Sequence, residues 1–200
     1  MTFTWITFVY LLLYTFRQCF ELRLDFINAA WLRAHRGRVP DHLKENMTVD
    51  QLGKALDYNL DNHQYLVVYR LVSIPVHWFF LLAGFQWLDS WLRGFELNPY
   101  LTGLCFFGAF SIISSVIDLP FNLYHDFVLE ERYGFNRKTL KLFLLDMLKG
   151  AGLGAVLGGI IIFLILWLMN MAGAFWWLLA VVMVLLFQVL MLWLVPVIIL

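Results

Sequence analysis

The side chains that could bind a metal ion or carry out catalysis are few and widely spaced in this 200-residue chain. No two of its five histidines are three to five residues apart, and there is no His-Glu-x-x-His. One cluster, His125 with Asp126, Glu130 and Glu131, offers a single histidine among carboxylates, which is a weak signal for zinc. Cys19 and Cys105 lie in separate apolar stretches, as buried thiols do. The residue types alone therefore predict no metal site and no catalytic constellation.

The composition predicts a membrane protein. Hydrophobic residues make up 62% of the chain and charged residues 14%, against about 45–50% and about 25% in soluble domains. The mean hydropathy is +0.77 and the formal net charge is zero. These values disfavour a soluble enzyme, a disordered chain and a protein that binds nucleic acid. We expect an all-α, polytopic integral membrane protein.

Five apolar stretches are long enough to cross a bilayer as helices, which takes about 20 residues each. None has the alternation of a barrel strand. The first is interpreted as a retained anchor because it has no basic n-region and no small-residue cleavage site. No repeat or linker interrupts the chain, so 1–200 is predicted to be one membrane domain. The predicted spans are 2–20, 68–92, 99–119, 151–171 and 174–200.

The basic residues predict the orientation. Of 14 lysines and arginines, 13 lie in or beside the polar loops 21–67 and 125–149, and only Arg93 falls on the other side. The positive-inside rule then places both loops in the cytoplasm and the N-terminus outside. An aromatic belt at the outer interface agrees with this topology; it consists of Trp5, Trp87, Trp91, Trp167, Trp176 and Trp177.

Local signals indicate that the loops contain helices. Thr48 and Gln51 fit a capping box that opens a helix through Leu52, Leu56 and Tyr58. Asn98-Pro99 fits the start of the third span. Lysines share one arc of the segment 138–149, with apolar residues mostly opposite, so we expect an interfacial helix that lies on the membrane before the fourth span turns inward.

Two ionisable residues fall in apolar spans, where such groups usually face the protein interior or a water-filled cavity. Asp118 either lines a cavity or lies hydrated or paired near the inner interface. His77 is either a hydrogen-bonded packing residue or part of a proton relay. Pro120 is expected to kink the third span.

Three glycines at spacing four, Gly150, Gly154 and Gly158, form one face of the fourth span. This spacing is typical of close helix packing in membranes. A dimer face and a ligand contact are the alternatives.

The most specific stretch is Leu119–Thr139, with Glu130, Glu131 and Arg132 followed by Tyr133 and Gly134. We expect Gly134 to allow a tight reversal, and Asn136 to cap the next helix. The three charged side chains are expected to pair with one another locally.

This stretch resembles the signature of the CAAX prenyl endopeptidases, the Ste24 family of membrane zinc metalloproteases. Tyr133 stands where Phe is commoner. Further matches are Val39-Pro40, Lys54-Ala55-Leu56-Asp57-Tyr58 and Trp176-Trp177, so the resemblance covers essentially the whole chain. Asp146 matches a further family pattern, Phe-x-x-Asp-x-x-Lys, which ends at Lys149. The other residues that match the family motifs are Pro120, Tyr124, Glu130, Glu131, Arg132, Gly134, Phe135 and Asn136.

The resemblance implies that this chain is the N-terminal membrane half of such a protease, or a fragment or remnant of one. In the family, five spans precede a catalytic domain with His-Glu-x-x-His, and seven spans enclose a water-filled chamber. None of the zinc ligands has a counterpart here, so we expect no cofactor in this chain and zinc only in a full-length homologue. The signature residues are carried over as structural elements near the cytoplasmic face of the chamber.

The implied partners are the lipid bilayer, a catalytic half in cis or in trans, and prenylated or membrane-protein substrates of a full-length homologue. The implied location is the bacterial inner membrane, or the endoplasmic reticulum membrane in a eukaryote. Two alternatives stay open: an inactive membrane scaffold, and a small multi-pass binding or transport protein that uses Asp118 and His77.

Overall fold

The structure, a computed structural model, describes residues 4–35 and 48–199, with side chains to residue 193. All regular elements in these ranges are helical, which confirms the all-α prediction. The α-helices are α1 (Trp5–Ala34), α2 (Val49–Phe79), α3 (Phe85–Arg93), α4 (Pro99–Tyr124), α5 (Glu130–Tyr133), α6 (Leu140–Met171) and α7 (Trp176–Ile199). Two π-helical turns, η2 (Phe80–Gly84) and η3 (His125–Leu129), and a short 3₁₀ turn, η4 (Gly173–Phe175), join some of them.

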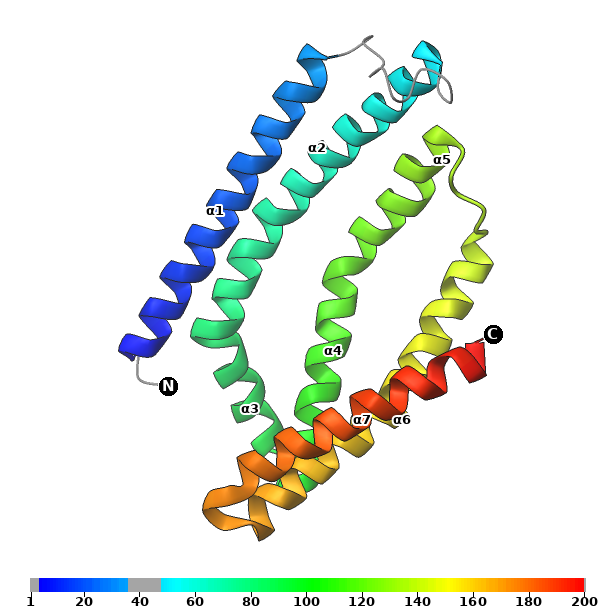
Figure 1. Cartoon of the computed structure of the whole chain (residues 1–200). Helices are drawn as coiled ribbons and strands as arrows, with labels where there is room; N and C mark the ends of the chain where they lie inside the picture. The colour runs from blue at the N-terminus through cyan, green and yellow to red at the C-terminus, as the bar shows by residue number, and fades with distance from the viewer. Residues whose placement is uncertain (1–3, 36–47, 200) are drawn as a thin grey trace. The chain divides into compact units, whose positions relative to one another are not determined.

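The chain forms two compact units, and each is described by itself. Unit 1 contains residues 1–88 and 115–138, and unit 2 contains residues 89–114 and 139–200. In unit 1, α1 lies beside α2 (Figure 1). In unit 2, α6 and α7 pack against each other. A single domain over 1–200 stays a prediction.

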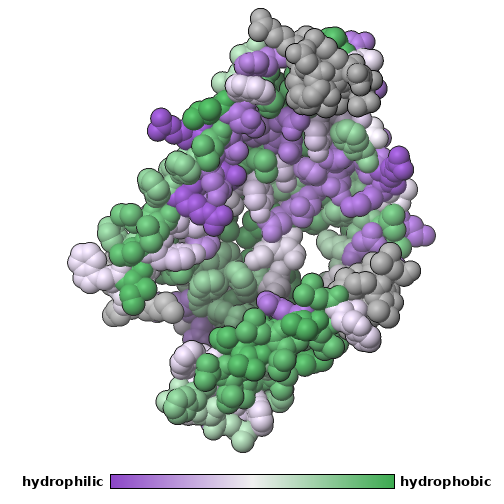
Figure 2. Space-filling view, in the orientation of Figure 1, coloured by the Kyte–Doolittle hydropathy of each residue, from purple (hydrophilic) through white to green (hydrophobic). Residues whose placement is uncertain are grey.

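Four helical segments are long and apolar enough to cross a membrane, which confirms a polytopic membrane protein. Three of them contain the predicted spans 68–92, 99–119 and 151–171 in full, and the fourth covers residues 174–193 of the last predicted span. The visible surface over α7 as far as Trp193 is mostly hydrophobic (Figure 2). The segments are Val49–Arg93, Pro99–Tyr133, Leu140–Met171 and Gly173–Trp193.

Residues 5–20 of the predicted first span, 2–20, lie in α1, which is not among these four segments. Arg17, Gln18 and Glu21 interrupt the apolar run of α1 and lower its hydropathy. Thr2, at the start of this predicted span, and Leu200, at the end of the last one, lie outside the described residues.

The polar stretch 21–67 is not one long loop, contrary to the prediction. α1 continues to Ala34, and α2 begins at Val49 and runs without a break into the second span. The capping box that starts α2 is confirmed: the Gln51 amide donates to Thr48 Oγ1 at 3.3 Å, and the Thr48 amide donates to Gln51 Oε1 at 2.9 Å. Helical backbone satisfies its own hydrogen bonds, so polar residues can extend a spanning helix beyond the bilayer.

The prediction of a separate interfacial helix over 138–149 is wrong. Helix α6 runs unbroken from Leu140 to Met171, and Thr139 caps it by accepting from the Leu142 amide at 3.3 Å. The glycines at 150–159 lower helix propensity but cost no backbone hydrogen bond, so they do not turn the helix. The Asn98-Pro99 start of α4 is confirmed, because Asn98 Oδ1 accepts from the Leu101 amide at 2.9 Å.

The predicted glycine face does not pack closely against another described helix. A Cβ added at Gly150, Gly154 or Gly158 would meet no other heavy atom within 4 Å. The close approach in unit 2 is instead at Gly103 of α4, where an added Cβ would lie 2.6 Å from Leu166 Cδ1 on α6. A dimer face or a ligand contact at the three glycines stays a prediction.

The environments of Gly103 and Gly154 predict different effects of a substitution by leucine on the free energy of unfolding. We expect Gly103→Leu to lower the free energy of unfolding by about 1–3 kcal/mol, because its side chain would overlap Leu166. We expect Gly154→Leu, which meets open space, to cause no loss and to raise it by up to about 1 kcal/mol, because leucine has the higher helix propensity. Unfolding of both variants in detergent checks this, and an equal loss at the two positions would contradict the assignment.

Candidate functional site

The signature residues lie where η3 and α5 meet α2 in unit 1. Gly134 ends α5 in the left-handed conformation, with φ 76°. The amides of Phe135 and Asn136 both donate to the Glu130 carbonyl, at 2.9 and 3.3 Å. These bonds reverse the chain, which confirms the turn predicted at Gly134. We call the following residues the signature cluster: Tyr58, Asp61, His125, Asp126, Glu130, Glu131, Arg132, Tyr133, Asn136 and Lys138.

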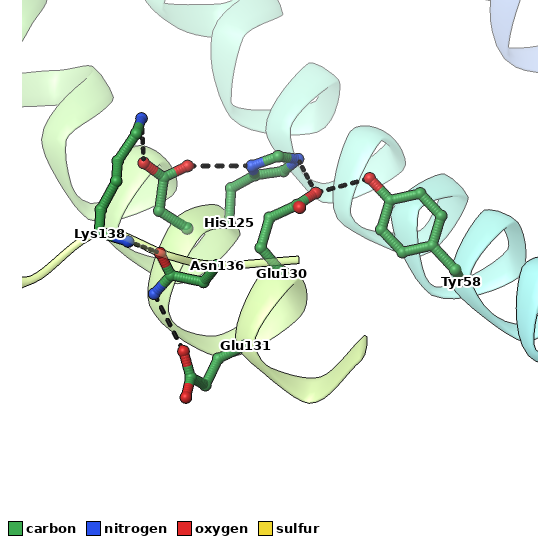
Figure 3. Close-up of polar contacts among 7 residues, drawn as sticks. Tyr58, His125, Glu130, Glu131, Asn136 and Lys138 are labelled. Carbon is green, nitrogen blue, oxygen red and sulfur yellow. Dashed lines mark hydrogen bonds and ion pairs between the residues drawn. The ribbon is translucent and has the colours of Figure 1, made fainter. Parts of the chain in front are cut away.

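Glu130 joins α5 to α2. Tyr58 of α2 donates its hydroxyl to Glu130 Oε1 at 2.6 Å, and His125 Nε2 lies 3.8 Å from the same oxygen (Figure 3). The rings of Tyr133 and Phe135 both meet the Tyr58 ring edge-on, at 5.3 and 5.1 Å. Tyr58 therefore contacts the signature through both its hydroxyl and its ring.

Asp61 forms the second connection, one turn further along α2. Arg132 Nη1 donates to Asp61 Oδ2 at 2.7 Å, and the Tyr133 hydroxyl donates to the same oxygen at 2.8 Å. Arg132 therefore pairs with a residue 71 positions away and not with its neighbours Glu130 or Glu131. The predicted local pairing is wrong, because successive residues on a helix point in different directions.

His125 lies between two carboxylates. Its Nδ1 is 3.3 Å from Asp126 Oδ1, while its Nε2 faces Glu130 (Figure 3). Lys138 Nζ donates to the other Asp126 oxygen at 3.3 Å. A connected path of polar groups therefore runs from Lys138 through His125 to Tyr58.

Asn136 stabilises the turn and does not cap α6, so its predicted role is wrong. Its Nδ2 donates to Glu131 Oε2 at 3.0 Å, and its Oδ1 accepts from the Lys138 amide at 2.7 Å. The helix cap is Thr139, three residues later. An asparagine side chain that bonds the amide two residues on is a common turn former.

The contacts between α4 and α2 continue beyond the signature. Tyr69 donates to Asp118 Oδ1 at 3.2 Å and meets the Phe121 ring edge-on at 5.1 Å. Tyr124 stacks on Tyr65 with ring centroids 6.2 Å apart. Helix α4 passes through the exposed Pro120 and changes to the π-helical turn only at His125.

The opposite side of α2 contacts α1. His77 Nε2 is 3.0 Å from the Tyr10 hydroxyl, and the His77 ring stacks on Tyr14 at 4.2 Å. Arg70 forms ion pairs with Glu21 at 3.4 Å and Asp25 at 3.2 Å. Asp118 and His77 therefore each have a tyrosine partner on a neighbouring helix.

Sequence reasoning missed most of the α2 partners, although their spacing is a signal. His63, Arg70 and His77 recur every seven residues and face α1, where Phe26 meets His63 edge-on at 5.2 Å. A second row at spacing three and four faces η3 and its neighbours; it consists of Tyr58, Asp61, Tyr65 and Tyr69. Polar and aromatic residues at these spacings lie on one helix face.

The remaining candidates lie apart from this cluster. Asp146 is exposed on α6. Val39-Pro40 lies outside the described residues. No group of three metal-ligating side chains occurs among the residues that the structure describes. A catalytic zinc normally needs three protein ligands, and the expectation of zinc only in a full-length homologue stays a prediction.

The arrangement is suited to holding helices together. Each carboxylate of the cluster has a hydrogen-bond donor or a cation beside it, and buried or half-buried charges need such partners. Hydrophilic side chains gather over the parts of α2 and α5 that carry the cluster (Figure 2).

The fold and the cluster define a class: a polytopic helical membrane protein whose polar helix ends are joined by side-chain pairs. The family model described as "CAAX prenyl protease N-terminal, five membrane helices" matches residues 28–200. The chain belongs to this family.

Curated relatives agree with the family assignment. The chain is similar to the "Probable CAAX prenyl protease 1" of Schizosaccharomyces pombe, with 30% identity over 64% of this chain and 30% of that protein. It is 29% identical to the "CAAX prenyl protease 1 homolog" of Arabidopsis thaliana over 86% of this chain and 44% of that protein. The chain thus spans less than half the length of these relatives.

A solved structure has the same fold. The crystal structure of S. mikatae Ste24p matches with a TM-score of 0.84, at 22% identity, over 98% of this chain and 47% of that chain.

The Tyr58–Glu130 bond predicts an energetic coupling between α2 and α5. Tyr58→Phe and Glu130→Gln should each lower the free energy of unfolding by about 1 kcal/mol, since a hydrogen bond to a carboxylate stabilises by more than a neutral one. The double variant should lose less than the sum of the two. Tyr124→Phe, whose ring stacks on Tyr65, is the matched control and should lose little. Additive losses at Tyr58 and Glu130 would show that the bond does not couple the helices.

Proposed function

We propose that this chain is the N-terminal membrane half of a CAAX prenyl protease-like zinc metalloendopeptidase. In this role it supplies chamber wall, membrane anchoring and substrate access for the proteolysis of prenylated or membrane-protein substrates. The zinc and its ligands come from a catalytic half, in cis or in trans. No step of the hydrolysis is assigned to residues of this chain.

The observation that carries the proposal is that the residues of the family signature bind α2. The family model matches most of the chain, and the signature's Glu130 and Arg132 both bind α2. A stretch that fixes the ends of α4 and α5 on α2 gives a catalytic half a rigid surface to meet. Pre-organised supports of this kind lower the cost of positioning reacting groups.

We also propose the orientation. The ends of α2 and α6 that carry Lys54 and Lys141 face the cytoplasm, and the N-terminus and Arg93 face the other side. This follows the positive-inside rule. The membrane is the inner membrane of a bacterium, or the endoplasmic reticulum membrane of a eukaryote.

Cysteine labelling tests the orientation. In a background with Cys19→Ala and Cys105→Ala, single cysteines at Lys54 and Lys141 should react with an impermeant maleimide from the cytoplasmic side only. A cysteine at Arg93 should react from the opposite side only. Reaction of the Lys54 and Arg93 positions from one side would overturn the proposed topology.

Co-expression tests the function. The purified chain alone should contain less than about 0.1 zinc per chain by elemental analysis, because a catalytic site needs three ligands, and should not cleave a prenylated peptide. When the chain is co-expressed with the remaining part of the Arabidopsis relative, cleavage should appear and should be lost with a chelator.

Glu130→Ala and Asn136→Ala should lower this cleavage by about tenfold or more, because both loosen the signature. Arg93→Ala, which removes only an exposed pair with Asp89, is the control and should retain activity. Stoichiometric zinc with chelator-sensitive cleavage in the chain alone would contradict the proposal. A correctly folded pair without activity would favour the inactive scaffold.

A further inference from the structure

Helix α1 carries an apolar stripe on the side away from α2. In the C-terminal half of α1 the stripe consists of Phe20, Leu24, Ile27 and Trp31, at spacings of four, three and four. Phe16 lies one turn before Phe20. The four side chains are 53%, 49%, 57% and 56% exposed. Residues at these spacings line one face of a helix, and a narrow apolar row of this kind is typical of a seam between two helices.

The stripe extends beyond the depth of the bilayer core. Helices α1 and α2 run antiparallel, since Tyr10 meets His77, Glu21 meets Arg70 and Phe26 meets His63. Ile27 and Trp31 therefore lie level with the part of α2 just before His63. That part of α2 is polar, with Asp57, Asn59, Asp61 and Asn62, and such residues are costly in hydrocarbon.

Acyl chains therefore cannot cover this part of the stripe. Contiguous apolar side chains that face water on a folded protein mark an interaction surface. The stripe faces away from the contacts of Glu21 and Asp25 with Arg70, so a partner could bind it without disturbing α2.

The charges beside the stripe favour one kind of partner. Arg23 borders Ile27 at a spacing of four, and no carboxylate of the described residues pairs with it. Arg17 borders Phe20 on the other edge and is 75% exposed, with Glu21 beside it. A second copy of the chain in the same membrane orientation would place Arg23 against Arg23, which is unfavourable.

We propose that the stripe Phe20–Leu24–Ile27–Trp31 is a docking site for a helix that has its own apolar row flanked by acidic side chains. The apolar row supplies contact area, and the acidic flanks pair with Arg17 and Arg23 and so select the partner.

Two water-soluble helical peptides of about three heptads test this proposal. Both carry leucine and isoleucine on one face; one has glutamate flanks and the other lysine flanks. Binding to the full chain in detergent is measured by fluorescence anisotropy of the labelled peptide. The glutamate-flanked peptide should bind about tenfold more tightly than the lysine-flanked one, and high salt should reduce the difference.

Substitutions assign the binding to the stripe. Leu24→Ser with Ile27→Ser should weaken binding of the glutamate-flanked peptide about tenfold or more, and Arg23→Gln should reduce the preference between the peptides. The matched control is Val68→Ser with Leu71→Ser, two apolar side chains of α2 that are 55% and 60% exposed; it should bind like the parent chain.

Equal binding of the two peptides, or no binding, would overturn the proposal. Two further results would assign the stripe to another occupant and overturn it as well. One is a disulfide-linked dimer formed without peptide through Ile27→Cys, in the background with Cys19→Ala and Cys105→Ala. The other is strong quenching of a bimane label at that cysteine by lipids brominated on their acyl chains.

Discussion

The structure of unit 1 depends on the length of α2 relative to the bilayer. Helix α2 continues through η2 and α3 as one segment, Val49–Arg93, of 45 residues, which is about 68 Å of helix, whereas a hydrocarbon core is about 30 Å thick. Much of α2 therefore projects out of the membrane, where lipid cannot hold it against its neighbours. Specific side-chain pairs do so instead, with α1 on one face of α2 and with α4, η3 and α5 on another.

The signature is the part of the sequence that supplies these pairs. Glu130 and Arg132 are two residues apart, yet each reaches a different turn of α2, at Tyr58 and at Asp61. Gly134 and Asn136 then return the chain, so that Lys138 reaches Asp126. This use of the motif is compatible with the proposed role as the membrane half of a protease, because it needs no catalytic chemistry from these residues.

Local features of the fold could be predicted from the sequence, because they depend on neighbouring residues. The capping box at Thr48, the start of α4 at Pro99 and the turn at Gly134 are of this kind. The lengths of the helices could not be predicted in the same way. Polar residues such as those before Val68 are typical of a loop, but they can equally well extend a helix. The regular spacing of the α6 glycines predicted a close helix contact that no other described helix makes. The close contact between α4 and α6 is instead at Gly103.

The partners of the site residues could not be predicted from local sequence. Arg132 and Asp61 are 71 residues apart, and only the packing of α5 on α2 brings them together. The regular rows on α2 could have indicated two contact faces, but not which helices meet them.

The most direct test of this account is a charge exchange between Asp61 and Arg132. Asp61→Arg and Arg132→Asp should each lower the thermal unfolding temperature in detergent, because each places like charges together. The double variant restores opposite charges at the same position and should recover more than half of the combined loss. Losses that simply add in the double variant would contradict the claim that the signature holds α5 on α2.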